Sequence, residues 1–167
     1  MKMIIKKICV WIPVIAIMLC IFSFSNQSGE QSMGLSRKVS EILVAFADGI
    51  HLIDMKWNDR EHAIEQMQTP VRKLAHAAEY FILAMAVYFA LKYDGFFYRF
   101  TKYLTFLIVL GYACLDEFHQ LYTAGRYGSV KDVVIDMCGC LVAVIISVIL
   151  DKRKNIILLV VLGLLFI

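Results

Sequence analysis

Apolar residues gather in four long runs along the chain, at positions 8–24, 71–91, 104–122 and 133–150. A helix of roughly 20 residues crosses the hydrocarbon core of a bilayer, so each run predicts one full transmembrane span. A fifth apolar stretch, at positions 156–167, is short for a regular crossing. It predicts a short C-terminal helix that either tilts across the membrane or enters only part of it.

The composition agrees with a membrane protein. Of the 167 residues, 60% are hydrophobic and 19% are charged, and the mean hydropathy is +0.71. These values are too apolar for a soluble domain of this length. The sequence therefore predicts a single all-α membrane domain over residues 1–167, a polytopic transmembrane helical bundle. A lipid bilayer is its expected surrounding, and no nucleic-acid partner is implied.

Basic residues in the short connections predict the orientation, because lysine and arginine are retained on the cytoplasmic side. With the amino terminus in the cytoplasm, that side holds three basic groups: Lys2, Lys6 and Lys7; Lys92, Arg99 and Lys102; and Lys152, Arg153 and Lys154. The first run lacks a small-x-small cleavage site, so we interpret it as a span rather than a cleaved signal peptide. Residues 25–69 then form an extracytoplasmic loop.

This predicted loop contains signals for amphipathic helices. Apolar residues recur at helical spacing in its first half, at Leu35, Val39, Ile42, Leu43 and Phe46. A helix there would serve either as a lid over a site or as an interfacial cover for the loop. A second, short helix is expected to begin at Asn58, with Glu61 completing a capping box. Pro70 is expected in the first turn of the following span.

Ionisable residues enter the apolar runs at one end of the predicted bundle. The end of the first run, the start of the second, the end of the third and the start of the fourth all fall at the predicted outer face. A charge at the centre of a transmembrane helix costs about 2.5–3.5 kcal/mol, so such residues are seldom kept without a partner or a task. We therefore predict a polar site just beneath the outer face. The alternative interpretation is an ion-pair network that holds the helices together.

Two groups of side chains are candidates for this site. Carboxylates and imidazoles suit acid–base chemistry, and the candidates for catalysis are His76, Glu79, Asp116, Glu117, His119 and Asp136. The candidates for ligand binding are Gln27, Arg72, Gln120, Arg126 and Asp132. Arg126 stands between Gly125 and Gly128 in a tight connection, which suits a phosphate or carboxylate ligand. Anchoring to lipid headgroups is the alternative for this arginine.

The sequence requires no metal and no other cofactor. Its five cysteines all lie inside apolar runs, and we interpret them as packing residues. The H-E-x-x-H zinc motif and a glycine-flanked serine nucleophile are both absent from the sequence. Carboxylate and imidazole three residues apart remain compatible with a divalent metal, so metal-assisted chemistry stays open.

Taken in order, these blocks of residues resemble the VanZ-like family of bacterial integral membrane proteins. The blocks are Phe24, Ser25, Asn26, Gln27 and Ser28; Arg72, Lys73, Ala75, His76, Glu79 and Tyr80; Asp116, Glu117, His119 and Gln120; and Gly125, Arg126, Asp132, Asp136 and Gly139. The resemblance implies a multi-pass protein of the bacterial plasma membrane. It also implies a link with reduced susceptibility to teicoplanin-type glycopeptide antibiotics.

Three functions follow from these observations. The first is binding of a lipid-linked or anionic envelope component, held by Arg72 and Arg126, which would contribute to glycopeptide tolerance. The second is an intramembrane acid–base or metal-dependent hydrolase acting on a lipid or cell-wall precursor, so the sequence leaves open whether the protein is an enzyme. The third is a proton-coupled carrier, which is the least supported because the polar residues occupy only one half of the membrane.

Overall fold

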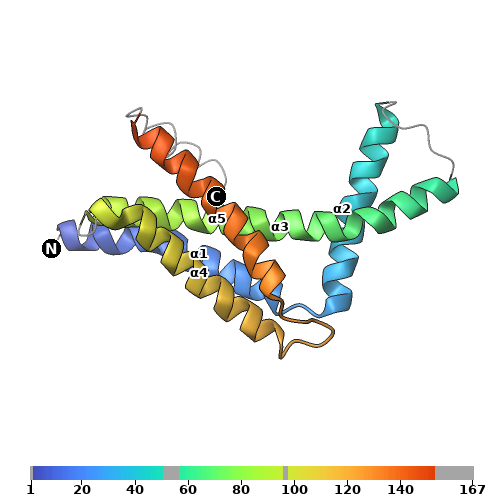
Figure 1. Cartoon of the computed structure of the whole chain (residues 1–167), viewed down its shortest axis with the longest axis horizontal. Helices are drawn as coiled ribbons and strands as arrows, with labels where there is room; N and C mark the ends of the chain where they lie inside the picture. Colours follow the sequence, from blue (N-terminus) through green and yellow to red (C-terminus); the bar gives the residue numbers. More distant parts are fainter. Residues whose placement is uncertain (1, 51–56, 96–97, 153–167) are drawn as a thin grey trace.

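The computed structural model describes residues 2–50, 57–95 and 98–152, and the C-terminal apolar stretch at 156–167 lies outside these residues. The described chain is all-helical and contains no strand (Figure 1). Its elements are α1 (Lys2–Ser25), α2 (Gly29–Gly49), α3 (Trp57–Asp94), the 3-10 turn η1 (Tyr98–Phe100), α4 (Thr101–Gln120) and α5 (Val130–Lys152). The predicted all-α class is confirmed.

Three of these helices are long and apolar enough to cross a membrane. Their candidate spans are Lys7–Ser25 in α1, Asp59–Asp94 in α3 and Val130–Leu150 in α5. The third apolar run corresponds to α4, which has 20 residues but is not among these candidates. A membrane crossing by α4, and with it the count of four spans, stays a prediction.

The long helix α3 is the centre of the fold, with α1, α4 and α5 lying along its C-terminal half (Figure 1). Its buried face contributes Tyr80, Leu83, Ala84 and Val87 to the hydrophobic core. The neighbouring helices complete this core with Val14 and Ile21 from α1, Val109 and Ala113 from α4, and Cys140 and Ala143 from α5. Small residues are prominent on the α4 and α5 faces, as expected where membrane helices approach closely.

Helices α3 and α5 make a particularly close backbone contact. A Cβ atom added to Gly139 of α5 would lie 2.0 Å from the carbonyl oxygen of Ala77 in α3. No side chain fits at such a distance, so only glycine allows α5 to cross α3 at this point. The crossing also sets the depth of Asp136, which lies one helical turn before Gly139.

The predicted break before Pro70 is wrong, because α3 runs without interruption from Trp57 to Asp94 and contains Pro70. A proline inside a helix removes the backbone donor for the carbonyl four residues earlier, here that of Gln66. Both Gln66 and Pro70 are exposed, so other donors can reach this carbonyl. The separate short helix expected from Asn58 is therefore the first part of α3.

Helix α2 turns its polar face inward and its apolar face outward. It begins with a capping box between Ser28 and Gln31 and buries Gly29, Ser32, Ser36, Ser40 and Val44. The hydroxyl groups of Ser36 and Ser40 donate to the carbonyls of Ser32 and Ser36, at 3.0 and 2.9 Å. The residues that predicted this helix, Leu35, Val39, Ile42, Leu43 and Phe46, are all exposed. The small residues of α2 therefore face the rest of the described chain, and its large apolar residues face away from it.

Ion pairs join α2 to the first half of α3. Arg37 lies 2.8 Å from Glu61 of α3 and 3.0 Å from Glu41 on its own helix. Near the other end of α2, Asp48 lies 3.6 Å from Arg60 of α3. These pairs offset most of the charge on α2, so the helix presents little net charge beside its apolar face.

The close crossing generates a stability prediction for Gly139→Ala. The added methyl group must push α5 away from α3, and overpacking of this kind costs about 1–3 kcal/mol in free energy of unfolding. We expect a lower thermal denaturation midpoint for the purified protein in detergent.

The matched control is Gly111→Ala in α4, where an added Cβ would meet nothing within 4 Å. Alanine is favoured over glycine inside a helix, so this variant should keep or raise the midpoint. Equal midpoints for Gly139→Ala and the unchanged protein would contradict the close crossing.

Candidate functional site

The candidate residues gather at one end of the bundle, called here the polar end. It comprises the end of α1, the start of α2, the middle of α3, the end of α4, the connection 121–129 and the start of α5. The side chains of Asp116, Glu117 and Gln120 in the last turns of α4 are at most 5% exposed, and Asp136 in α5 is fully buried. The packed helices therefore bury these polar side chains inside the protein.

The connection 121–129 is held against the start of α2. The backbone N–H of Gly29 donates to the carbonyl of Ala124 at 3.0 Å. Gly125 has a φ of +70°, and a Cβ added to Gly29 would lie 2.2 Å from its carbonyl oxygen. Both positions therefore require glycine: Gly29 because the backbones approach closely, and Gly125 because its backbone is left-handed.

Arg126 extends from this connection to the end of α1. Its Nε donates to the carbonyl of Gln27 at 3.0 Å, and a terminal nitrogen donates to the carbonyl of Phe24 at 3.1 Å. The last carbonyls of a helix lack partners within the helix, so Arg126 caps α1 while also lining a cavity. Burial, together with the nearby charge of Arg72, lowers the pKa of the Arg126 guanidinium, and Asp116 and Glu117 act in the opposite sense.

Glu117 also has a structural role. One of its oxygens accepts the backbone N–H of Ser129 at 2.7 Å, and the other accepts the side-chain amide of Gln120 at 3.2 Å. The same amide donates to Asp116 at 3.2 Å. A Cβ added to Gly128 would lie 2.3 Å from the backbone oxygen of Glu117, so the chain passes very close to α4 here. Glu117 and Gln120 thus shape the end of α4 and the connection.

A cavity of about 140 Å³ lies between α2, α3 and the connection. Five candidates line it: Arg72, His76 and Glu79 from α3, Gln27 after α1, and Arg126. The Nδ1 atom of His76 lies 3.9 Å from a Glu79 oxygen, at the outer limit of an ion pair. Ser32 and Ser36 of α2 form the opposite wall. These two serines are not among the predicted site residues, because the apolar spacing of α2 marks only the opposite face of the helix.

Deeper in the bundle lies a second group of polar side chains, called here the buried acid group. Several of its atoms are buried without a hydrogen-bond partner among the described residues: Oδ1 of Asp116, both oxygens of Asp136, the Tyr80 hydroxyl and Nε2 of His119. His119 stacks on Phe22 of α1, with ring centroids 4.7 Å apart. Tyr80 was not among the predicted site residues, although it lies one turn after His76 on the same face of α3.

Asp132 lies partly buried in the first turn of α5 and does not line the cavity. Over the described ranges, no three histidine, cysteine or acidic side chains lie close enough together to hold a metal ion. The candidate residues therefore form three groups. Some line the cavity that contains Arg72 and Arg126, some make structural hydrogen bonds, and some belong to the buried acid group.

An all-helical fold with three apolar helices of membrane length and a polar cluster at one end defines a helical membrane protein. The model of the VanZ/LLP1 family matches residues 10–151, and the chain belongs to this family. The match includes every candidate site residue, so the polar end lies within the family's own region. No curated protein and no solved structure matches the chain.

The contacts of Arg126 generate a prediction for Arg126→Ala. Loss of two hydrogen bonds from a charged donor should lower the free energy of unfolding by about 1.5–3 kcal/mol, because the end of α1 loses its cap. The check is thermal denaturation in detergent, with exposed Lys131→Ala as the control that removes an equal charge nearby. Identical midpoints for the two variants would show that these bonds do not stabilise the fold.

Proposed function

We propose that this VanZ/LLP1 protein crosses the bacterial plasma membrane four times, with its amino terminus in the cytoplasm and its polar end at the extracytoplasmic face. The span beyond the three candidates above is α4, whose residues 104–115 are apolar; its acidic side chains and His119 lie in its last turns, and Lys102 lies in its first turn. The basic residues of the short connections support this orientation. Helix α2 and the first part of α3 then belong to the extracytoplasmic side.

We infer that the cavity at the polar end binds the anionic group of a lipid-linked or other envelope component. The observation that carries this proposal is the presence of two arginines, Arg72 and Arg126, on the lining of one cavity. The positive charge of Arg72 lies close enough to lower the pKa of the Arg126 guanidinium. A phosphate or carboxylate between them would relieve this repulsion and accept hydrogen bonds from both guanidinium groups.

The neighbouring side chains suit such a ligand. The Ser32 hydroxyl and the imidazole of His76 add polar groups to the lining, and Leu35 and Val39 supply an apolar wall. A cavity with both polar and apolar walls fits a headgroup that is attached to a lipid chain. Capture of such a component would alter the surface that teicoplanin-type antibiotics recognise, which agrees with the resemblance to resistance-linked proteins.

Arg72→Gln tests this proposal with the least damage to the fold, because Arg126 also caps α1 whereas Arg72 has no ion pair with any described residue. We expect the affinity of the purified protein for a synthetic prenyl phosphate to fall roughly tenfold, as a charge-assisted hydrogen bond is lost. Teicoplanin susceptibility of cells that express the variant should rise in parallel.

Lys73→Gln is the matched control, because Lys73 is adjacent in sequence, exposed and absent from the cavity lining. Its affinity for the prenyl phosphate should equal that of the unchanged protein. If Arg72→Gln binds as tightly as this control, the cavity does not hold the anion.

The buried acid group favours a second function, an intramembrane acid–base hydrolase that cleaves a lipid or cell-wall precursor. Asp136 is fully buried with no donor for either oxygen among the described residues, and Tyr80 and Asp116 also have unpartnered atoms. Such groups are costly to keep unless they meet a ligand, a proton or water. In such a hydrolase, Asp136 or Asp116 would act as a general acid or base that transfers a proton during the reaction.

This alternative predicts that the purified protein releases inorganic phosphate from the prenyl phosphate, and that Asp136→Asn abolishes the release. The assay is run with and without added Mg²⁺ or Mn²⁺, so that metal-dependent and metal-independent reactions are separated. Asp59→Asn, an exposed change at the start of α3, is the control. An unchanged protein that releases no phosphate under either condition rules out this hydrolysis.

A further inference from the structure

Glu79 distinguishes the cavity at the polar end from a simple anion site. Its carboxylate lines the same cavity as Arg72 and Arg126, and its side chain is 27% exposed. Among the described residues, no lysine or arginine lies within ion-pair distance of Glu79. Nδ1 of His76 lies 3.9 Å from it, which is too far for a hydrogen bond. A partly desolvated carboxylate is costly without a cationic partner, so a positive group on the ligand would be stabilised beside Glu79.

Acidic side chains also surround Arg126. Burial lowers the pKa of the Arg126 guanidinium most strongly, and the charge of Arg72 acts in the same sense. Three carboxylates act in the opposite sense: Asp116, Glu117 and Glu79. A ligand with negative charge alone would therefore meet repulsion as well as attraction at the polar end. A ligand that carries a positive group together with its anion is electrostatically complementary to these mixed charges.

The charged groups of the cavity are separated along α3. Arg72 and Glu79 are seven residues apart, so they lie on one face of the helix. Their separation along the helix axis is about 10 Å. A ligand that contacts both must therefore extend along α3, with its anion beside the two arginines and its cation beside Glu79.

The apolar part of the lining suits an acyl chain attached to such a headgroup. Phe24, Leu35 and Val39 line the cavity, and each is also exposed on the surface of the described chain. An acyl chain that leaves the cavity would cover these side chains, and burial of apolar area is favourable. The ligand therefore combines an anion, a cation and an apolar tail.

We propose that this cavity binds the phosphoethanolamine headgroup of an aminophospholipid. Arg72 and Arg126 hold the phosphate, and the ammonium donates hydrogen bonds to the carboxylate of Glu79. The acyl chains extend over Leu35 and Val39. This inference rests on the anion site proposed above and adds a second, cationic contact to it. Glu79 then selects a headgroup that carries an amine over one that carries phosphate alone.

The test measures the affinity of the purified full-length protein in detergent for three phospholipids with identical short acyl chains. Phosphatidylethanolamine carries the phosphate and the ammonium, and phosphatidylglycerol carries the phosphate without an amine. N-acetyl-phosphatidylethanolamine keeps the nitrogen but loses its positive charge. We expect the parent protein to bind phosphatidylethanolamine roughly tenfold more tightly than either other lipid, because only its ammonium is a charged donor for Glu79.

Glu79→Gln should reverse this preference. The change removes the partner of the ammonium, so phosphatidylethanolamine binding should weaken roughly tenfold. It also removes the repulsion between the carboxylate and a phosphate, so phosphatidylglycerol should bind more tightly than to the parent. A merely structural role of Glu79 would weaken all three lipids alike.

Glu65→Gln is the matched control, because Glu65 is an exposed acid on the same helix and is absent from the cavity lining. It should bind all three lipids as the parent does. If Glu79→Gln gives the same affinities as Glu65→Gln, or if the parent binds phosphatidylglycerol as tightly as phosphatidylethanolamine, the amine is not recognised and the inference is wrong.

Arg72→Gln separates this inference from the proposed function. It should weaken the binding of all three lipids and leave the preference for the amine in place. Unchanged binding of every lipid by Arg72→Gln would show that the anion site itself is wrong. Weaker binding by Arg72→Gln, together with no effect of Glu79→Gln, would leave the anion site standing and overturn only the amine selectivity.

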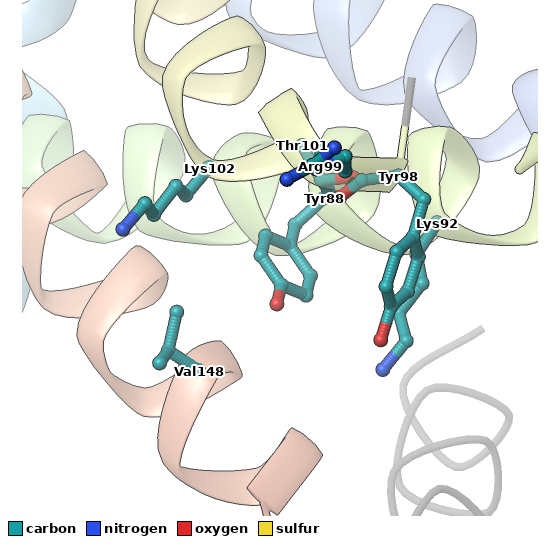
Figure 2. A pocket seen from close by; sticks show the side chains of 7 residues that line it. All are labelled: Tyr88, Lys92, Tyr98, Arg99, Thr101, Lys102 and Val148. Carbon is teal, nitrogen blue, oxygen red and sulfur yellow. Dashed lines mark hydrogen bonds between the residues drawn. The ribbon is translucent and has the colours of Figure 1, made fainter. Parts of the chain in front are cut away.

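A cavity elsewhere on the protein does not affect this comparison. It has a volume of about 220 Å³ and lies between the end of α3, η1 and the start of α4, with Lys92, Arg99 and Lys102 on its lining (Figure 2). Lipid held there would contribute equally to the parent and to every variant of the polar end. The differences between these variants therefore report on the cavity that contains Arg72.

O-phosphoethanolamine, the soluble headgroup, distinguishes a lipid from a free solute. It should compete with phosphatidylethanolamine only at concentrations far above that of the lipid, because it lacks the chains that cover the apolar wall. Competition at equal concentration, with the same dependence on Arg72 and Glu79, would show that the cavity takes a soluble ligand and would overturn the assignment to a phospholipid.

Discussion

The contact between Gly139 and the backbone of Ala77 is the constraint on which the polar end depends. It lets α5 lie directly on α3, and α3 in turn contacts every other helix of the described chain. Asp136 lies one turn from Gly139, and Tyr80 lies one turn from Ala77, so the crossing buries both side chains. A polar group in an apolar bundle keeps its position only if the backbone around it is fixed, and here a glycine provides that precision.

Three more glycines allow close backbone contacts at the polar end of the bundle. Gly29, Gly125 and Gly128 allow the connection 121–129 to touch both the start of α2 and the end of α4. The hydrogen bonds of Glu117 and Arg126 then fix this connection from two sides. The arginine of the cavity is therefore positioned before any ligand arrives, and a preorganised cation binds an anion with less loss of entropy.

Much of this arrangement follows from local pattern. Long apolar runs predicted the helices, and helical spacing placed Arg72, His76 and Glu79 on one face of α3. The capping role of Arg126 had no local signal, because its carbonyl partners lie 99 and 102 residues earlier in the chain. The prediction for Pro70 was wrong because proline is frequent in the first turn of a helix, whereas α3 continues through Pro70 and leaves the exposed Gln66 carbonyl accessible to other donors. The inward serines of α2 were missed because apolar spacing alone does not say which face meets a neighbour.

The reversed polarity of α2 has a consequence for how the cavity with Arg72 exchanges its contents. Ser32 and Ser36 close one wall of that cavity, while Ile42 and Phe46 cover the outside of the same helix. Any displacement of α2 away from α3 must keep its outer side chains in an apolar medium, because moving them into water is unfavourable. With α2 at the extracytoplasmic membrane surface, as proposed, entry into the cavity is coupled to the bilayer, and an amphiphile diffusing within the outer leaflet reaches the cavity more readily than a solute from the aqueous phase.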